Sequence, residues 1–261
     1  MSHKCHSFLL DEGGHCIAEM AGGSWDFEHG HTIPRHAHAE DQLLFASEGV
    51  MTVETSEGIW VVPPLRAVWI PAEVAHGVSM SGRVSMRTLY LVPKLCKTAL
   101  RKCMVVNISS LLRELILHAC KFSKLRRSVP SERHVIDMIL DQMELVESIP
   151  VQLPHPMDSR ARKLADRLRA NPREQRSLGV LAMECGASKR TMQRLFAEES
   201  GMSFSRWRQR ARLIHATQSL AAGQSVTNAA LDAGYSTTSA FISMFRKQMG
   251  TTPARYLMAA E

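Results

Sequence analysis

A repeated pattern of small residues near the C-terminus constrains the fold of this chain more than any other feature. An internal repeat of this length indicates two copies of one supersecondary unit. In each copy a small residue, a turn glycine, a cap serine and an amphipathic stretch follow one another, which is the order of a helix-turn-helix. Three residues recur, each 48 positions later: Ala182, Gly186 and Ser188 return as Ala230, Gly234 and Ser236.

Positive charge is concentrated in the part of the chain that holds the repeat. Residues 157–261 contain 17 Lys/Arg and 8 Asp/Glu, a net charge of +9, whereas the residues before them carry a net charge of −2. Basic surface that displaces counterions from phosphate is the electrostatic signature of nucleic-acid binding. A merely solvated basic surface is the alternative, but its coincidence with the repeat favours double-stranded DNA as the partner.

The chain from Asp158 onward is expected to be all helical. Ser or Thr occupies the positions that helix N-caps require, and Gly occupies helix ends. About seven helices are expected, one of them a long connector from Ser203 to about Ala222. The expected caps are Ser177, Ser188, Ser203, Ser225, Ser236 and Thr252.

The second helix of the first unit is expected from Lys189 to about Glu199, and its outward side chains suit base recognition. Arginine can bind the two acceptors of guanine, and glutamine can pair with adenine. Solubilising charge is the alternative role for the two arginines. The expected inward residues are Met192, Leu195 and Phe196, and the expected DNA contacts are Lys189, Arg190, Gln193 and Arg194.

The corresponding helix of the second unit, from about Thr238 to Gln248, offers shorter side chains. Hydroxyl groups can bind phosphate and methyl groups can contact thymine, so we expect weaker base recognition here. Arg246 and Lys247 are expected to bind phosphates. Of the four alternating arginines at 206–212, some should clamp phosphates and others should be structural. The remaining candidate contacts are Thr237, Thr238, Ser239, Ile242 and Ser243.

Several C-terminal motifs together resemble the DNA-binding domain of AraC/XylS-type transcription regulators. The resemblance covers the chain from Asp158 to its end. It implies two helix-turn-helix units that enter successive major grooves, with base contacts at Gln193 and Arg194 and a variable contact at Arg190. Thr238, Ser239 and Ser243 match the contact positions of the second unit, and Ser243 stands where some relatives carry Arg. The motifs are Ser188-x-Arg190-Thr191-Met192-x-Arg194-x-Phe196, Gly201-x-Ser203, Arg212-Leu213-x-x-Ala216, Ala229-Ala230-x-x-x-Gly234-Tyr235, Ser239-x-Phe241-x-x-x-Phe245 and Gly250-Thr251-Thr252-Pro253.

The N-terminal part contains short apolar runs between turn residues, which predict the strands of a sandwich or barrel. Two amphipathic helices are expected after it, at 109–122 and 131–147. Their apolar faces pack either on their own barrel or on a second copy in a dimer; periodicity alone leaves both open. A proline-rich stretch then marks a linker. The expected strands include 42–45, 50–54, 58–62, 67–70 and 88–92.

Two histidine motifs in this part resemble those of a cupin barrel: Pro34-x-His36-x-His38-x-x-x-Gln42 with Glu48-Gly49, and Pro71-Ala72-Glu73-x-x-His76. In metal-binding cupins two close histidines, a glutamate and a distant histidine hold one ion. Here Gln42 takes the place of the glutamate and Glu73 that of a glycine. The resemblance implies either an effector pocket or a divalent metal, zinc, copper or iron(II), at His36, His38 and His76, with His29 and His31 as further candidates.

The expected fold class is therefore α+β and multidomain. It comprises a cupin-like effector-binding β-barrel at 1–100, a helical segment for dimerisation at 101–149, a linker at 150–157 and an all-α DNA-binding domain at 158–261, with helix-turn-helix units at about 177–198 and 225–248. At 261 residues the chain suits two such domains.

The function expected is that of an effector-responsive, sequence-specific transcription regulator that is not an enzyme. Its expected partners are promoter DNA, a small-molecule effector, RNA polymerase and a second copy in a homodimer. The alternatives are a metal-dependent cupin oxygenase with an accessory DNA-binding domain, and an architectural DNA-binding protein. No apolar run reaches the ~18 residues of a membrane helix, and Met1–His6 lack the apolar core of a signal peptide, so a cytoplasmic location is expected.

Overall fold

The structure is a computed structural model that describes residues 9, 16–64, 66–93, 95–96, 102–144, 148–149, 152–249 and 252–258. The N-terminal residues Met1–His6, the end of the helix expected at 131–147, and Gly250 and Thr251 lie outside the described residues. The chain divides into two compact units, a sheet-containing unit formed mainly by residues up to 152 and a helical unit formed mainly by residues from 153 onward. No helix of the described residues is long and apolar enough to cross a membrane.

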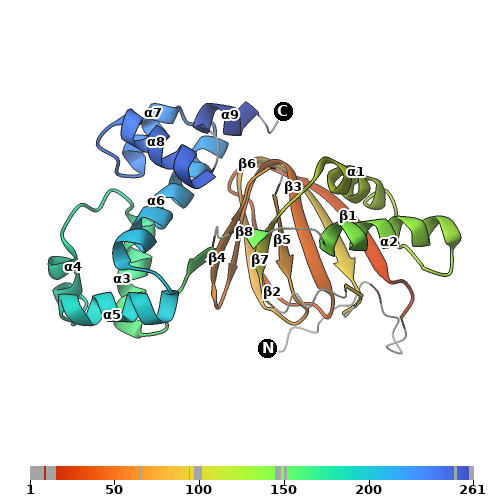
Figure 1. Ribbon diagram of the computed structural model, residues 1–261, viewed down its shortest axis with the longest axis horizontal. Helices are drawn as coiled ribbons and strands as arrows, with labels where there is room; N and C mark the ends of the chain where they lie inside the picture. The colour runs from red at the N-terminus through yellow and green to blue at the C-terminus, as the bar shows by residue number, and fades with distance from the viewer. Residues whose placement is uncertain are drawn as a thin grey trace. The chain divides into compact units, whose positions relative to one another are not determined.

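Antiparallel strands build the first unit (Figure 1). The two longest strands, β3 and β6, pair along most of their lengths, with register shifts near Glu48 that mark a β-bulge. The hydrogen-bonded order is β1-β6-β3-β5-β7-β8, while β2 pairs with β6 and β4 pairs with β3. The strands are β1 (Met20–Phe27), β2 (Thr32–His36), β3 (Asp41–Thr55), β4 (Gly58–Val62), β5 (Arg66–Ile70), β6 (His76–Leu91), β7 (Met104–Asn107), β8 (Ser148–Ile149) and β9 (Gln152–Pro154).

Two helices, α1 (Ser110–Ala119) and α2 (Pro130–Glu144), cover one face of this sheet (Figure 1). Each buried Leu or Ile side chain contributes about 1.5–3 kcal/mol through removal of its apolar surface from water. The apolar faces therefore pack on the sheet of their own chain, and they do not require a second copy for burial. The core cluster includes Leu112, Ile116, Ile136 and Ile139 of the helices and Leu43, Phe45, Trp69 and Leu89 of the sheet.

The prediction of a sheet-rich N-terminal part and an all-helical C-terminal part is confirmed, but its finer features differ. Among the described residues the path from β1 to β8 is open, so a closed barrel is not observed. The segment expected to be helical at 101–149 also contains the strands β7 and β8. β1 was not predicted, because its Gly22-Gly23 pair interrupts the apolar alternation on which the other strands were recognised.

Seven helices form the second unit among the described residues, as expected. A buried Trp207 on the long helix α6 packs against Phe196 of α5, with 5.3 Å between ring centroids. The helices are α3 (Ser159–Ala170), α4 (Leu178–Glu184), α5 (Lys189–Ser200), α6 (Phe204–Ala221), α7 (Val226–Asp232), α8 (Thr238–Met249) and α9 (Pro253–Met258). The pairs α4–α5 and α7–α8 are the two copies of the repeat.

The two copies share one turn geometry but differ in length by one residue. Gly186 and Gly234 both adopt the left-handed conformation, with φ 74° and 79°. The cap of α5 is Ser188, whose hydroxyl accepts the N–H of Thr191 at 3.1 Å. The cap of α8 is Thr237 and not the expected Ser236, since its hydroxyl accepts the N–H of Ala240 at 3.2 Å. Equivalent residues of the two copies are thus 48 positions apart up to Gly186 and Gly234, and 49 positions apart from the helix caps Ser188 and Thr237 onward.

Two arginines of α6 bind the loop that joins α3 to α4. Arg212 donates to the carbonyl oxygens of Pro172 at 3.1 Å and Glu174 at 3.0 Å. Arg208 also donates to the Glu174 carbonyl, and to that of Arg176 at 3.2 Å. These two arginines are structural, while Arg206 is exposed and stays available for phosphate.

The same loop also contacts the second helix pair. The side-chain amide of Gln175 donates to the carbonyl oxygen of Gly234 at 2.8 Å. Arg173 forms an ion pair with Asp232 at the end of α7. The loop at 171–177 therefore connects both copies of the repeat to one another within the helical unit.

The two turn glycines provide a matched pair for testing this packing. We expect Gly186→Ala to lower the free energy of unfolding by about 1–2 kcal/mol, the cost of a left-handed alanine. Gly234→Ala should cost at least ~1 kcal/mol more, because its Cβ would lie 2.7 Å from the carbonyl oxygen of Pro172, whereas nothing lies within 4 Å at position 186. Urea unfolding followed by helical circular dichroism measures both; equal losses would contradict the tight contact.

Candidate DNA-binding face and histidine cluster

The face of α5 that was expected to contact DNA is exposed. Its four candidate residues Lys189, Arg190, Gln193 and Arg194 all face solvent, while Met192, Leu195 and Phe196 are buried. Ser188 satisfies an amide at the start of the helix. Exposed donors in this helical order can reach base edges in a major groove.

The guanidinium of Arg194 is already oriented in the free protein. Its Nη1 lies 2.6 Å from Oε2 of Glu198, one turn further along α5, and both side chains are more than half exposed. Exposed pairs of this kind contribute at most about 1 kcal/mol, so a stronger acceptor on a base or phosphate can displace Glu198 at small cost.

The candidate contacts on α8 divide into several roles. Thr237 caps the helix, and Ile242 is half-buried, packing in part against the core of the second helix pair. Thr238 is half-buried. The exposed candidates are Thr237, Ser239, Ser243, Arg246 and Lys247.

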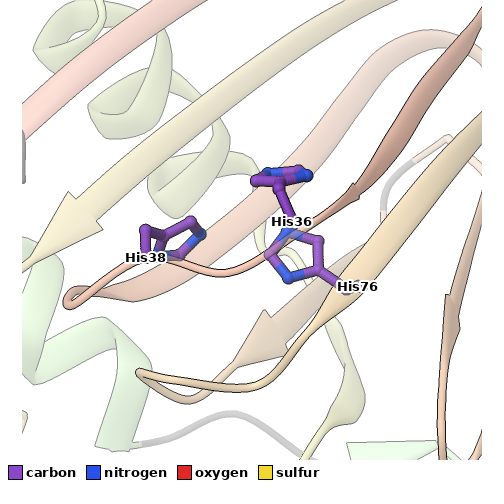
Figure 2. Close-up of side chains that lie close together, drawn as sticks. All are labelled: His36, His38 and His76. Carbon is purple, nitrogen blue, oxygen red and sulfur yellow. The ribbon is translucent and has the colours of Figure 1, made fainter. Parts of the chain in front are cut away.

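Three histidines lie together in the first unit, as the two histidine motifs predicted (Figure 2). His36 ends β2, His38 follows it in the loop, and His76 begins β6. One ring nitrogen from each lies within 4.8 Å of the others, and ring centroids are 4.4 Å apart for His36 and His76. Among the described residues this is the group with metal-ligand spacing, and it does not include His29 and His31.

Main-chain carbonyl oxygens orient all three rings. The Nδ1 atom of His36 lies 2.9 Å from the oxygen of Pro34, that of His38 lies 2.8 Å from the oxygen of Glu40, and that of His76 lies 2.8 Å from the oxygen of Val74. A carbonyl oxygen only accepts, so each Nδ1 carries the proton, and a neutral ring then has its lone pair on Nε2.

Gln42 links this cluster to the sheet. Its side-chain Oε1 lies 3.1 Å from Nε2 of His38, and its Nε2 donates to Thr88 Oγ1 at 2.9 Å. The Thr88 hydroxyl in turn donates to the carbonyl oxygen of Leu43 at 3.3 Å. A neutral His38 with its proton on Nδ1 has a lone pair on Nε2, and the Gln42 side chain donates to it when the NH₂ group of the amide faces the ring.

His76 is the most buried of the three, with no exposed surface. Its burial lowers its pKa to about 4, with His36, His38 and Arg35 adding to the effect and the bond to Val74 opposing it. Its Nε2 has no hydrogen-bond partner among the described residues. A neutral imidazole with an unsatisfied acceptor is therefore held inside the fold.

Three residues near the cluster were not predicted: Glu40, Thr88 and Tyr90. The carboxylate of buried Glu40 lies 3.9 Å from Nδ1 of His38, and the ring of Tyr90 lies 5.2 Å from that of His38. Thr88 and Tyr90 lie two residues apart on β6, so their side chains are on the same face of the sheet. This spacing was the signal in the sequence that could have identified both as neighbours of the cluster.

Glu73, in the place of a glycine in the second motif, adopts a left-handed conformation with φ 64°. Its N–H donates to the carbonyl oxygen of His38 at 2.9 Å, which ties the two motifs together. A non-glycine residue pays about 1–2 kcal/mol for this conformation. Backbone strain thus lies next to the histidines.

Two family models match the chain. One, described as an AraC-like ligand binding domain, matches residues 18–143. The other, described as a helix-turn-helix domain, matches residues 181–259. The first match contains the histidine cluster, and the second contains both exposed helix faces.

The relatives found are transcriptional regulators. The HTH-type transcriptional regulator NimR of Escherichia coli K12 is 34% identical over 226 residues, which are 87% of this chain and 82% of NimR. RipA of Corynebacterium glutamicum is 38% identical over 103 residues, 40% of this chain and 31% of its own length. A solved structure of ToxT from Vibrio cholerae with bound unsaturated fatty acid matches at TM-score 0.40 and 12% identity, over 92% of this chain and 95% of that chain. These matches give no support to the cupin oxygenase alternative.

The low pKa of His76 predicts how stability depends on pH in the presence of a chelator. The folded pKa of about 4 lies below the ordinary 6.5, so the unfolded chain binds the proton first as the pH falls. The stability that follows from this pKa difference is fully present above pH 6.5. As the pH falls from 6.5 to 4, the free energy of unfolding decreases by about 3 kcal/mol.

Urea unfolding at pH 7, 5.5 and 4 measures this loss, and His76→Gln is the control because it lacks the titrating group. The free energy of unfolding of the variant should fall less over this range, by about the amount given above. Parallel pH curves for the two proteins would show that His76 is not held neutral by burial.

Proposed function

The chain belongs to the AraC family of HTH-type transcriptional regulators, and we propose that α4–α5 and α7–α8 are its two DNA-binding helix-turn-helix units. The main support for this proposal is the exposed face of α5, a capped helix that presents Arg190, Gln193 and Arg194 on one side. This face combines the donors that read guanine and adenine.

The two units have unequal roles in this proposal. With the offset of 49 residues, α8 places shorter or half-buried side chains where α5 places its long polar ones. Arg246 and Lys247 lie in the last turn of α8 and bind phosphates, which fixes orientation without reading sequence. The equivalent positions are Arg190 and Ser239, Gln193 and Ile242, and Arg194 and Ser243.

The first unit binds the small-molecule effector in this proposal, on the side of the sheet where His36, His38, Gln42 and His76 gather. These polar groups are mostly buried, and a small number of convergent polar groups in apolar surroundings can orient a small ligand. Effector binding shifts the equilibrium between two states of the regulator only through different affinities for them. We propose that this unit is a variant of the cupin barrel in which the described strands leave one edge open.

RNA polymerase and a second copy of the chain complete the proposed set of partners. The apolar faces of α1 and α2 are occupied by their own sheet, so a dimer would use other surface. Leu111 and Met138 are the large apolar side chains of these helices that stay exposed, at 47% and 44%. Sedimentation of the full chain, alone and on DNA, distinguishes one copy from two.

We expect Arg194→Ala to weaken binding to the specific site by about 1–3 kcal/mol, because a bidentate contact to a base is lost. Binding to random DNA should change much less. Lys247→Ala is the matched control, since loss of a phosphate contact weakens both DNAs alike. Fluorescence anisotropy at fixed salt measures each affinity; equal losses for Arg194→Ala on both DNAs would identify Arg194 as a phosphate contact.

A footprint on the promoter beside the gene of this protein should show a protected site that spans two adjacent major grooves per subunit. The expectation follows from two helix pairs held in one unit by the loop at 171–177. Ser239→Ala with Ser243→Ala should shorten or weaken only the half of the footprint covered by α8. Protection of one groove alone would contradict the role of the second pair.

A further inference from the structure

We propose that His36, His38 and His76 bind one divalent transition-metal ion of the zinc type, and that Gln42 gates this site. The regulatory meaning of the site rests on the function proposed above, but the binding itself does not. Four observations of the cluster carry the proposal: the donor set, an unsatisfied buried nitrogen, the ring orientation, and the competing amide of Gln42.

The donor set suits a borderline metal ion. With each Nδ1 protonated toward a main-chain oxygen, every neutral ring offers its Nε2 lone pair. Imidazole nitrogen is a preferred ligand of Zn²⁺, Cu²⁺ and Ni²⁺, whereas Mg²⁺ prefers oxygen. Three such ligands leave one position of a tetrahedral ion open for water or an effector.

The Nε2 atom of His76 is buried and has no partner among the described residues. An acceptor left unsatisfied inside a protein costs free energy, so a fold that keeps one commonly uses it. A cation that binds this lone pair removes the cost. The half-exposed ring of His36, 4.4 Å away between centroids, provides access to the cluster from solvent.

The surroundings of the rings are those that metal-binding histidines usually have. Such a histidine donates its other ring N–H to a carbonyl or carboxylate, which orients the ring and raises its basicity. All three histidines do so here. The carboxylate of Glu40, 3.9 Å from Nδ1 of His38, adds a negative charge behind one ligand, while Arg35 is the opposing positive group.

Gln42 competes with the metal for His38. Its amide lies 3.1 Å from the Nε2 atom that would bind the ion. Nitrogen ligands of tetrahedral zinc lie about 3.4 Å apart, since each Zn–N distance is about 2.1 Å. The cluster nitrogens, which lie within 4.8 Å of one another, must therefore approach further, and His38 must leave Gln42 to do so.

Release of Gln42 would also change the sheet. The same amide is hydrogen-bonded to Thr88 Oγ1 on β6 at 2.9 Å, and the carbonyl of Thr88 accepts from Sγ of Cys120 just after α1. Occupancy of the histidines is thereby linked to a hydrogen bond that holds β3 to β6. This link is a property of glutamine at position 42, because a carboxylate there would itself bind the ion.

The test uses the untagged full-length chain after treatment with a chelator. Zn²⁺ is titrated against the protein in competition with a coloured chelator of known affinity, and Mg²⁺ serves as the negative control. We expect one Zn²⁺ per chain and a rise in melting temperature on binding. Circular dichroism confirms that each variant is folded.

Three variants assign the ion to the site. His36→Gln, which replaces a half-exposed residue and should leave the fold intact, should weaken Zn²⁺ binding at least tenfold. Gln42→Glu should tighten it at least tenfold, because it replaces a competing amide by an anionic ligand. Gln142→Glu on α2 adds the same charge in the same unit away from the histidines and should leave the affinity unchanged.

An unaltered zinc affinity in both His36→Gln and Gln42→Glu would overturn the proposal and assign any bound zinc to other groups. No zinc-dependent stabilisation of the native chain would overturn it as well. DNA binding is measured separately, so a chain that binds zinc but no promoter would count against the proposed function and not against the metal site.

Discussion

Hydrogen bonds from two arginines of α6 to main-chain carbonyls are the constraint on which the helical unit depends. Arg208 and Arg212 each hold two oxygens of the loop at 172–176. A guanidinium offers five donors in a rigid fork, so one side chain can bind two carbonyls where a lysine could not match the geometry. The loop thus anchored reaches Gly234, and both helix pairs become parts of one body. Two of the arginines in this half of the chain therefore stabilise the fold of the helical unit and are not free to bind phosphate.

The first unit uses its main chain in a similar way. Carbonyl oxygens of Pro34, Glu40 and Val74 each accept from Nδ1 of a neighbouring histidine, so main-chain groups orient all three rings in the same way. The left-handed residue at Glu73 helps to close this arrangement, because its N–H binds the carbonyl of His38. The cluster is preorganised by loops that the two long strands hold in place.

Residue pattern predicted the parts of this molecule that depend on local order. The helical unit, the caps at Ser177, Ser188, Ser203 and Ser225, and the inward faces of α5 and α8 follow from spacing along the chain. The two histidine motifs also indicated that His36, His38 and His76 meet. What could not be predicted depends on contacts distant in sequence. These are the order of the described strands, which do not close into a barrel, the burial of the α1 and α2 faces on them, the loop contacts of Arg208 and Arg212, and the hydrogen bond between Gln42 and Thr88.

The extra residue in the turn before α8 has a consequence for engineering a regulator of altered target preference. If the exposed α5 face proposed to contact DNA were copied onto α8 at the 48-residue offset of the sequence repeat, its arginines would fall at positions 238 and 242. One residue of a helix corresponds to a rotation of about 100°, so such a graft would put the glutamine in place of the buried Phe241 and both arginines at half-buried positions. A transfer by 49, to Ser239, Ile242 and Ser243, keeps two of the three positions exposed and the third half-buried. Side chains can therefore be exchanged between the two copies only when α5 and α8 are aligned helix to helix, and not by the spacing of the sequence repeat.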